Sequence, residues 1–285
     1  MARSWRPTAP NATKVVPRST DVDTAALDCT PVATRLAGDL TDLGVRPGGV
    51  LLVHASLSSL GYIPGGAATT INALQRALGD EGTLLIPALS YATVNADQPV
   101  FDLQHTPSCI GAIPEYFRTR ADTWRSASPT HSVCGAGPRA AELLADQHLD
   151  DTPVGPHSPF RRLRDAGGQL LFLGCGMRPN TSMHGVEEVA EAPYLFKSQS
   201  VAYTAHLPDG IHQLGIRRHN FDGWEQRYER VADQLTPEEL RIGPVLKATA
   251  HLLDVPAMWE RALAMLARDP YCFVQRREDA NGDGT

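Results

Sequence analysis

The sequence predicts a single α/β domain with a central mixed sheet flanked by helices and a helical C-terminal part. Short apolar runs that are typical of buried strands, such as VLLVH at 50–54, alternate with segments of helical periodicity. No repeat and no linker-like stretch divides the chain after residue 30, and two helical patterns, at 221–235 and 256–269, lie near its end. We therefore expect strands and helices to interleave in one body.

In the first part of the chain, the proline, glycine and serine residues between the apolar runs indicate where each element begins and ends. Pro31 opens a helix that has leucines at helical spacing and stops at Gly44. The elements expected after it are a buried strand at 50–54, a Ser- and Gly-rich turn at 55–66, a helix at 67–79 and a second buried strand at 83–87.

A loop of about 23 residues, from Ala88 to Ile110, comes next, and a loop of this length in a compact domain is usually functional or disordered. Later elements are a short helix starting near Gly111 or Pro114, strands at 132–137 and 169–176, a helix at 181–192 capped by Asn180 or Thr181, and an alternating, antiparallel-type strand at 201–207.

The chain has 285 residues and a net charge of −6, from 26 basic and 32 acidic residues. Its first 20 residues hold four basic residues and no acid, so the remainder holds 22 basic and 32 acidic residues, a net charge of −10. An acidic body argues against nucleic acid as a partner and favours a cationic small molecule. We expect a flexible arm at 1–29, the domain proper at 30–275 and a loose polar tail at 276–285.

Cysteine usage and hydropathy exclude several classes of protein. The five cysteines are widely separated, and no CxxC or Cys/His ligand spacing occurs, so the sequence supports neither a disulfide framework nor a metal site. No apolar run approaches the roughly 18 residues of a membrane helix, and the N-terminus lacks the apolar segment of a secretory signal. We expect a cytoplasmic protein with no metal and no membrane partner; a homodimer is left open.

The strand at 50–54 runs directly into the turn HASLSSLG, from His54 to Gly61. Open α/β sheets bind ligands at the carboxyl ends of their strands, where a Ser- and Gly-rich turn offers hydroxyls and backbone N–H groups to a phosphate. The turn is neither a P-loop nor a dinucleotide fingerprint. Ser and Gly are also ordinary turn residues, so function and plain structure are about equally supported here.

A second glycine motif, GCG at 174–176, follows the buried strand QLLFL. Glycines in this position occur in methyltransferases and dinucleotide-binding proteins, but the third glycine and the acidic residue about 20 positions on are missing. A tight turn after a core strand is the favoured interpretation.

On the helix expected at 181–192, His184 shares a face with Glu187 and Glu188, three and four residues later. A carboxylate that orients an imidazole is the usual construction of a general base. Solvated glutamates beside a surface histidine are the alternative. A further candidate segment, RSASPTHSVCGAG at 125–137, has Arg125 and His131 ahead of an apolar strand. Arg125 could meet a phosphate and His131 could be a second catalytic residue, but a structural role is favoured for this segment taken alone. The sequence has no Gly-x-Ser-x-Gly elbow, so covalent acyl-enzyme chemistry is not indicated.

Taken in order, these motifs resemble the aminoglycoside 3-N-acetyltransferase family, also called the antibiotic N-acetyltransferases, whose fold is distinct from that of the GNAT acetyltransferases. The resembling blocks cover about half of the chain and lie at 44–66, 82–87, 101–118, 125–140, 151–163 and 170–190. The resemblance implies acetyl-CoA as co-substrate without a metal, and a cationic amine acceptor, the 3-amino group of an aminoglycoside, with antibiotic resistance as the outcome.

The resemblance also implies roles for individual residues. His184, oriented by Glu187, would be the general base, and Thr181 would help to stabilise the oxyanion. CoA would contact residues that match the family's motifs: His54, Ser56, Leu57, Ser58, Ser59, Leu60, Gly61, Gly65, Gly66, Ser108, Arg125, Ser126, His131 and Ser132. The cationic acceptor would meet Tyr91, Asp102, Glu115 and Glu188. Two alternatives stay open: the same chemistry on an amine that is not an aminoglycoside, and a non-catalytic module that binds CoA or a nucleotide.

Overall fold

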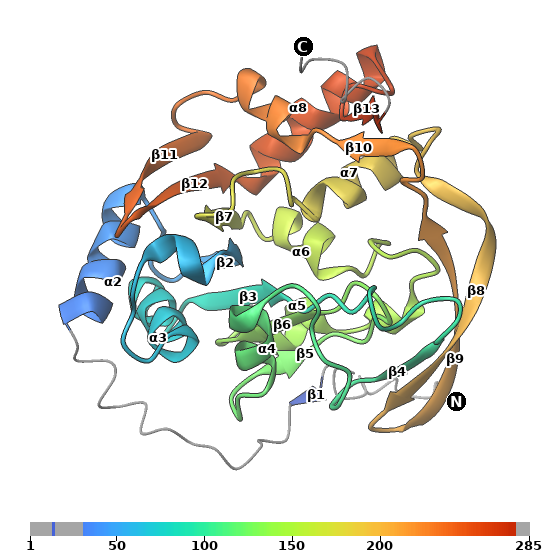
Figure 1. Ribbon diagram of the computed structural model, residues 1–285, viewed down its shortest axis with the longest axis horizontal. Helices are drawn as coiled ribbons and strands as arrows, with labels where there is room; N and C mark the ends of the chain where they lie inside the picture. The colour runs from blue at the N-terminus through green and yellow to red at the C-terminus, as the bar shows by residue number, and fades with distance from the viewer. Residues whose placement is uncertain (1–12, 15–30, 278–285) are drawn as a thin grey trace, which may run out of the picture.

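A mixed sheet of eight strands forms the centre of the computed structural model, which describes residues 13–14 and 31–277 (Figure 1). In spatial order the strands are β1 (Thr13–Lys14), β5 (Trp124–Arg125), β6 (Val133–Ala136), β3 (Thr83–Pro87), β2 (Val50–Ala55), β7 (Gln169–Leu173), β12 (Ala248–Asp254) and β11 (Leu240–Val245). Strand β2 is parallel to both of its neighbours, β3 and β7, and the outer pairs are antiparallel. The expected α/β class with a central mixed sheet is confirmed.

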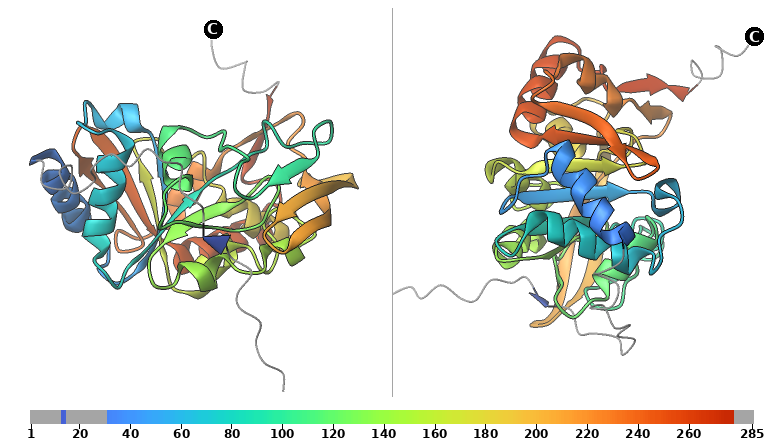
Figure 2. Two further views of the ribbon diagram at one scale, coloured as in Figure 1. Left: turned by 90° about the horizontal axis from the view of Figure 1, so that it is seen from below. Right: turned by 90° about the vertical axis from the view of Figure 1, so that its left-hand side faces the viewer.

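Helices cover both faces of this sheet because its central strands are buried on both sides. On β2, Leu51 and Val53 enter one core, and Val50 and Leu52 enter the other, as the two-residue period of a strand requires. The first core is completed by α2 (Pro31–Leu43), α3 (Ala67–Leu78) and α4 (Ala112–Arg118). The second is completed by α5 (Ala140–Leu144), α6 (Pro159–Asp165), α7 (Ser182–Val189) and α8 (Val255–Arg268). The two layers of helices are separated by the sheet in Figure 2.

Two smaller sheets flank the central one. A long hairpin of β8 (Phe196–Leu207) and β9 (Gly210–His219) curves along one end of the molecule, with β4 (Val100–Asp102) parallel to β8 (Figure 1). Strand β10 (Trp224–Gln226) pairs with β13 (Val274–Arg276). The 3-10 helices are η1 (Leu57–Leu60), η2 (Gln147–Leu149) and η3 (Tyr228–Gln234).

Local sequence signals explain where the helices begin. Asp254 caps α8 by accepting a hydrogen bond from the N–H group of Ala257, at 3.1 Å, with Pro256 in the first turn. Ser158 caps α6 in the same way, ahead of Pro159. Caps and first-turn prolines are short-range features, which is why the starts of these helices follow from the sequence.

The helix expected at 221–235 is wrong. Strand β10 and the 3-10 helix η3 occupy this stretch, and the β11–β12 hairpin follows it, so α8 is the helical part of the C-terminal region. The buried side chains of η3, Tyr228 and Val231, lie three residues apart, a spacing that suits a 3-10 turn as well as an α-helix. The backbone of β10 instead finds its partner in β13, about 50 residues away in sequence.

Two strands of the structure include residues from the segments that were expected to lie outside the domain. Thr13 and Lys14, within the expected arm, pair with β5, and Arg276, within the expected tail, belongs to β13. The other residues of those two segments, apart from Arg277, lie outside the described part of the chain. Within residues 31–277, no helix is both long enough and apolar enough to cross a membrane.

Candidate active site

Two adjoining cavities open at the carboxyl ends of the parallel strands β2 and β7. The main cavity has a volume of about 690 Å³ and contains His54, Thr181 and His184 in its wall. The second, of about 650 Å³, is lined by the turn that follows β2, and the two share Ala55 and Ile110. The parallel pairing of β2 and β7 brings both turns to the same edge of the sheet, where α/β proteins bind ligands. A separate open hollow of about 750 Å³ lies beside Arg76 and Arg120.

His184 projects from α7 into the main cavity, and its side chain is 13% exposed. Its Nδ1 atom lies 3.4 Å from Oε2 of Glu187 and 2.9 Å from the hydroxyl oxygen of Tyr228. Tyr228 in turn donates a hydrogen bond to Oε2 of Glu187, at 2.9 Å, and Tyr194 donates to Oε1 at 2.7 Å. Glu187 is fully buried among these donors.

This arrangement fixes the tautomer of His184. Burial and the neighbouring Glu187 carboxylate raise the pKa of Tyr228 well above its ordinary value, so the phenol stays protonated. Its O–H group donates a hydrogen bond to Glu187. The phenol oxygen therefore accepts from His184, which must carry its proton on Nδ1. The lone pair of Nε2 is left for the cavity side of the ring, as a general base requires.

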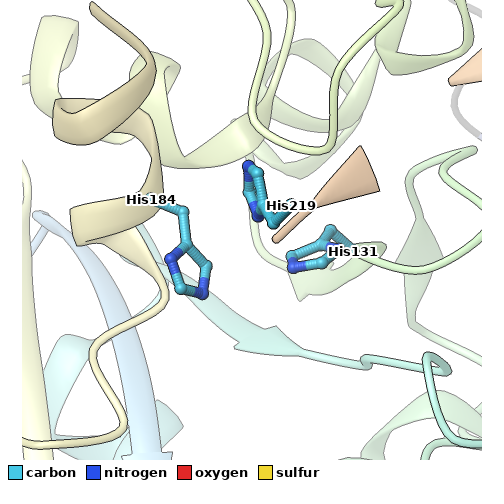
Figure 3. A group of neighbouring side chains, drawn as sticks. All are labelled: His131, His184 and His219. Atoms are coloured by element: carbon cyan, nitrogen blue, oxygen red, sulfur yellow. The ribbon is translucent and has the colours of Figure 1, made fainter. Parts of the chain in front are cut away.

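Two further histidines, His131 and His219, lie beside His184 (Figure 3). The ring centroids are 4.9 Å apart for His184 and His219, 5.4 Å for His131 and His219, and 5.8 Å for His131 and His184. Burial, and then the charge of neighbouring histidines, lower the pKa of both His131 and His219 well below the ordinary value. Both rings are therefore neutral near pH 7.

Glu188, which was predicted to meet the substrate, instead supports His219 from behind. Its Oε1 atom lies 2.8 Å from Nε2 of His219 and accepts the N–H group of Val154, while its Oε2 atom accepts from Thr152 and lies 3.3 Å from Arg161. Glu188 is 8% exposed and does not line either cavity. The two adjacent glutamates thus hold two different histidines.

His54 lies at the end of β2, stacked against Phe172 at a centroid distance of 5.2 Å. Burial, with a smaller contribution from the charge of His184, lowers its pKa to about 3, so this ring also stays neutral. The Nε2 atom of His54 is buried and has no hydrogen-bond partner among the described residues. It is the one predicted CoA-binding histidine at the strand end itself.

The predicted CoA-binding turn divides into residues that line a cavity and residues that do not. Those lining the second cavity are Ser56, Leu57, Ser58, Gly61 and Gly66. Leu60 packs in the core, Ser59 donates a hydrogen bond to the Ser56 hydroxyl, and Gly65 precedes the N-cap of α3. Close approach also explains the GCG motif, because a Cβ atom on Gly174, whose φ is +75°, would lie 2.7 Å from Cβ of Ser59.

Arg125 does not reach either cavity. Its guanidinium is fully buried and donates to Ser132 and to the carbonyl groups of Leu103, Thr106 and Ala88, at 2.7 to 3.3 Å. The predicted partners Ser126 and Ser132 are fully buried as well, and the N–H group of Ser108 donates to Glu115. This geometry gives Arg125 a structural part, tying the long loop to the sheet.

The predicted acceptor-binding residues separate in the same way. Tyr91 lines the main cavity from the long loop, but Asp102 bonds to His105, and Glu115 forms an ion pair with Arg118 at 2.6 Å. Among the described residues, the wall of the main cavity contains no carboxylate, whereas it contains Arg178, Arg218 and Arg277. The expected acidic lining is therefore absent from the described part of this wall.

Sequence reasoning missed Tyr228, Tyr194 and His219. Tyr228 lies 44 residues after His184, on the stretch for which an α-helix was expected, and no local spacing connects the two. The side-chain partner of His219, Glu188, lies 31 residues earlier. Tyr228 and His219 lie more than 30 residues from their partners, and Tyr194, seven residues after Glu187, follows the end of α7, so helical spacing indicates none of these contacts.

Comparison with known proteins gives a consistent result. The family model described as aminoglycoside 3-N-acetyltransferase matches residues 52–267. Aminoglycoside N(3)-acetyltransferase IV from Salmonella sp is 34% identical over 246 residues, which are 85% of this chain and 90% of that protein.

Solved structures agree with this match. A histidine-to-alanine variant of aminoglycoside acetyltransferase AAC(3)-IVa, in complex with a gentamicin, is similar with a TM-score of 0.75 and 31% identity, covering 87% of this chain and 93% of that chain. AAC-IIIb, in a binary complex with CoASH, is similar with a TM-score of 0.74 and 28% identity, covering 83% of this chain and 96% of that chain.

Proposed function

The chain belongs to the aminoglycoside 3-N-acetyltransferase family, and from this premise we propose that it acetylates an aminoglycoside amine with His184 as the general base. Its activity is the transfer of an acetyl group from acetyl-CoA to the 3-amino group, a modification that confers antibiotic resistance. The observation that carries the role of His184 is the anchoring of its Nδ1 atom by Tyr228 and Glu187, which directs the Nε2 lone pair to the cavity.

Acetyl-CoA would lie along the second cavity, whose described lining offers the Ser56 and Ser58 hydroxyls, apolar side chains and the open backbone of Gly61 and Gly66. Hydroxyl and backbone N–H groups can hold a pantetheine amide and phosphates without a cluster of cations. The thioester would pass Ala55 and Ile110, which both cavities share, and reach the face of His184.

The reaction would be a direct displacement within a ternary complex. The acceptor nitrogen attacks the thioester carbonyl carbon, and Nε2 of His184 takes the proton that this nitrogen loses as the C–N bond forms. The tetrahedral intermediate then collapses, the C–S bond breaks, and the CoA thiolate leaves and receives the proton from His184. The products are the amide and CoASH, with no group left on the protein.

Thr181 would contribute to the stabilisation of the oxyanion. It is 5% exposed, lines the main cavity and forms the N-cap of α7, the helix that carries His184. In this proposal the positive end of the helix dipole would lie near the carbonyl oxygen, on which negative charge develops.

A second candidate concerns the acceptor rather than the reaction. Arg178, Arg218 and Arg277 line the main cavity, and the described part of the wall has no carboxylate. This lining favours an acceptor amine that also bears an anionic group, such as a carboxylate or phosphonate. The acetyl donor and the role of His184 are the same in both candidates.

A panel of acceptors in a CoA-thiol release assay tests both. We expect gentamicin and apramycin to be acetylated with a kcat/KM far above that of amino acids and aminophosphonates. Selective turnover of an anionic amine would replace the aminoglycoside with the second candidate. Binding of acetyl-CoA by calorimetry, with no turnover of any amine, would leave only a CoA-binding module.

A further inference from the structure

The three histidines around the main cavity come from three separate parts of the fold and converge at one point. His131 lies between β5 and β6, His184 on α7, and His219 at the end of β9 (Figure 3). One ring nitrogen from each histidine lies within 4.8 Å of one ring nitrogen from each of the others. Three imidazoles meeting at a cavity is the ligand set of an open transition-metal site.

Each of these rings is held from behind through its other nitrogen. Nδ1 of His131 lies 2.8 Å from the hydroxyl of Thr130, and Nε2 of His219 lies 2.8 Å from Glu188. Nδ1 of His184 contacts Tyr228 and Glu187. Metal-binding histidines almost always have such outer partners, which fix the ring orientation and direct the remaining nitrogen towards the ion.

The nitrogens that remain lack partners in the described structure. Nδ1 of His219 is buried and has no hydrogen bond to any described residue. The side chain lines the cavity and is 6% exposed. A buried ring nitrogen without a partner is costly, and an ion at the cavity would satisfy it. The opposite nitrogens of His131 and His184 are the ones on the side of the ring away from Thr130 and from Tyr228.

We propose that Nε2 of His131, Nε2 of His184 and Nδ1 of His219 form a binding site for a divalent transition-metal ion, with Zn²⁺ as the best match. Three neutral imidazoles suit Zn²⁺, and its fourth coordination position would face the cavity and be taken by water. Tetrahedral Zn–N bonds of about 2.0–2.1 Å bring the ligand nitrogens to about 3.4 Å from one another. Since one nitrogen of each ring lies within 4.8 Å of one nitrogen of each other ring, these distances need to shorten by at most about 1.4 Å when the ion binds.

Two carboxylates behind the ligand rings favour a cation at this point, although arginines line the same cavity. The carboxylates of Glu187 and Glu188 stand directly behind His184 and His219. Two arginines act against the binding of a cation: Arg161, which lies 3.3 Å from Glu188, and Arg218, which lies in the cavity wall.

The site has a consequence for catalysis that rests on the proposed function. A metal ion would occupy the Nε2 lone pair of His184, the same lone pair that would take the proton of the acceptor. Metal binding and acetyl transfer therefore exclude each other, and Zn²⁺ acts as a reversible inhibitor that a chelator removes.

Calorimetry with ZnCl₂ on the full chain, purified without a polyhistidine tag and treated with chelator, tests the site directly. We expect one ion per chain for the wild type and an affinity weaker by more than about 100-fold for His219→Ala, because the loss of a direct ligand exceeds the roughly 10- to 100-fold cost of losing an outer partner of a ligand. His131→Asn serves as a second variant if His219→Ala does not fold by circular dichroism. The matched control is His105→Ala, an exposed histidine that bonds to Asp102 and should leave the affinity unchanged.

Two further readouts, the absorption of bound Co²⁺ and the acetylation rate with and without Zn²⁺, separate metal binding from its effect on catalysis. Co²⁺ in place of Zn²⁺ should give the visible absorption of a tetrahedral site in the wild type and lose it in His219→Ala. Failure of the wild type to bind Zn²⁺ at one to one, or an affinity equal to that of the wild type in both ligand variants, would overturn the site. Stoichiometric binding that leaves the acetylation rate unchanged would overturn the role of His184 as base instead.

Discussion

The Oε2 atom of Glu187 lies 3.4 Å from Nδ1 of His184, and the carboxylate is completely buried beneath the imidazole. The two residues are one helical turn apart on α7, so the helix itself brings them together. A distance of 3.4 Å alone is long for a charge-assisted hydrogen bond. The Tyr228 hydroxyl, 2.9 Å from both groups, closes the gap and makes the three side chains a single unit.

Replacement of His184 should remove the general base. We expect His184→Asn to lower kcat by about 10²- to 10⁴-fold, the usual contribution of general-base catalysis. Acetyl-CoA affinity measured by calorimetry should stay close to that of the wild type. A folded variant that keeps a near-full acetylation rate would exclude this role for His184.

Tyr228 should act as a positioning residue. Tyr228→Phe removes the hydroxyl that bridges His184 and Glu187, and we expect kcat to fall about tenfold or more, with little change in the KM for acetyl-CoA, since a hydrogen bond to a charged group contributes about 1.5–3 kcal/mol. Tyr194→Phe is the matched control, because its hydroxyl contacts Oε1 of Glu187 and not the imidazole. Equal kcat losses in the two variants would contradict a special role for Tyr228.

Arg125 should stabilise the fold rather than bind CoA. Arg125→Ala leaves the buried carbonyl groups of Leu103, Thr106 and Ala88 without their donor, and we expect the free energy of unfolding to drop by about 3–5 kcal/mol. Arg125→Lys keeps the charge and should lose less stability. If the lysine variant instead unfolds like the wild type but has a KM for acetyl-CoA raised tenfold, Arg125 binds CoA as the family resemblance implies.

The turn after β2 should contact CoA. Ser58→Glu places a negative charge in the second cavity, where it would repel the CoA phosphates. Two like charges at about 4 Å repel by at least ~1 kcal/mol. We therefore expect the KM for acetyl-CoA to rise by about five- to tenfold while kcat is retained. Ser200→Glu, on the exposed part of β8, adds the same charge away from both cavities. An unchanged KM in Ser58→Glu would move the CoA site elsewhere.

Glu115 should contribute to stability in a pH-dependent way. Burial raises its pKa, but hydrogen bonds from Arg118 and from the N–H group of Ser108 outweigh burial and hold the pKa below the ordinary 4.5. The stabilisation is therefore present above pH 4.5 and is lost as the pH falls below it. We expect Glu115→Gln to lower the free energy of unfolding by about 1 kcal/mol at pH 7, a value that allows for solvent screening.

Urea unfolding at pH 7 and at pH 3.5 measures this difference, which should shrink at the lower pH. A difference that is equal at both values would show that the Glu115 charge has no part in it. The KM for an aminoglycoside should be unchanged, because Glu115 is paired with Arg118 and does not line the cavity.

Short-range signals explain what could be predicted of the fold. The apolar runs of β2, β3 and β7, the first-turn proline of α2 and the family motifs gave the α/β class and the family, both of which are confirmed. The stretch at 221–235 was the main error, since the partner of β10 is distant in sequence and the three-residue spacing of η3 also suits an α-helix. In this stretch, the pairing of β10 with β13 decides the backbone conformation.

The same division holds for the site. By itself, the sequence determined the turn after β2 and the His184–Glu187 pair, because each lies within a few consecutive residues and needs only local geometry. Only the tertiary structure decided that Glu188 supports His219 rather than a substrate, that Arg125 is buried, and that Tyr228 bridges His184 and Glu187. It also decided that three histidines from distant segments meet at one point. Contacts between residues far apart in sequence arise from the packing of whole elements, and no spacing along the chain records them.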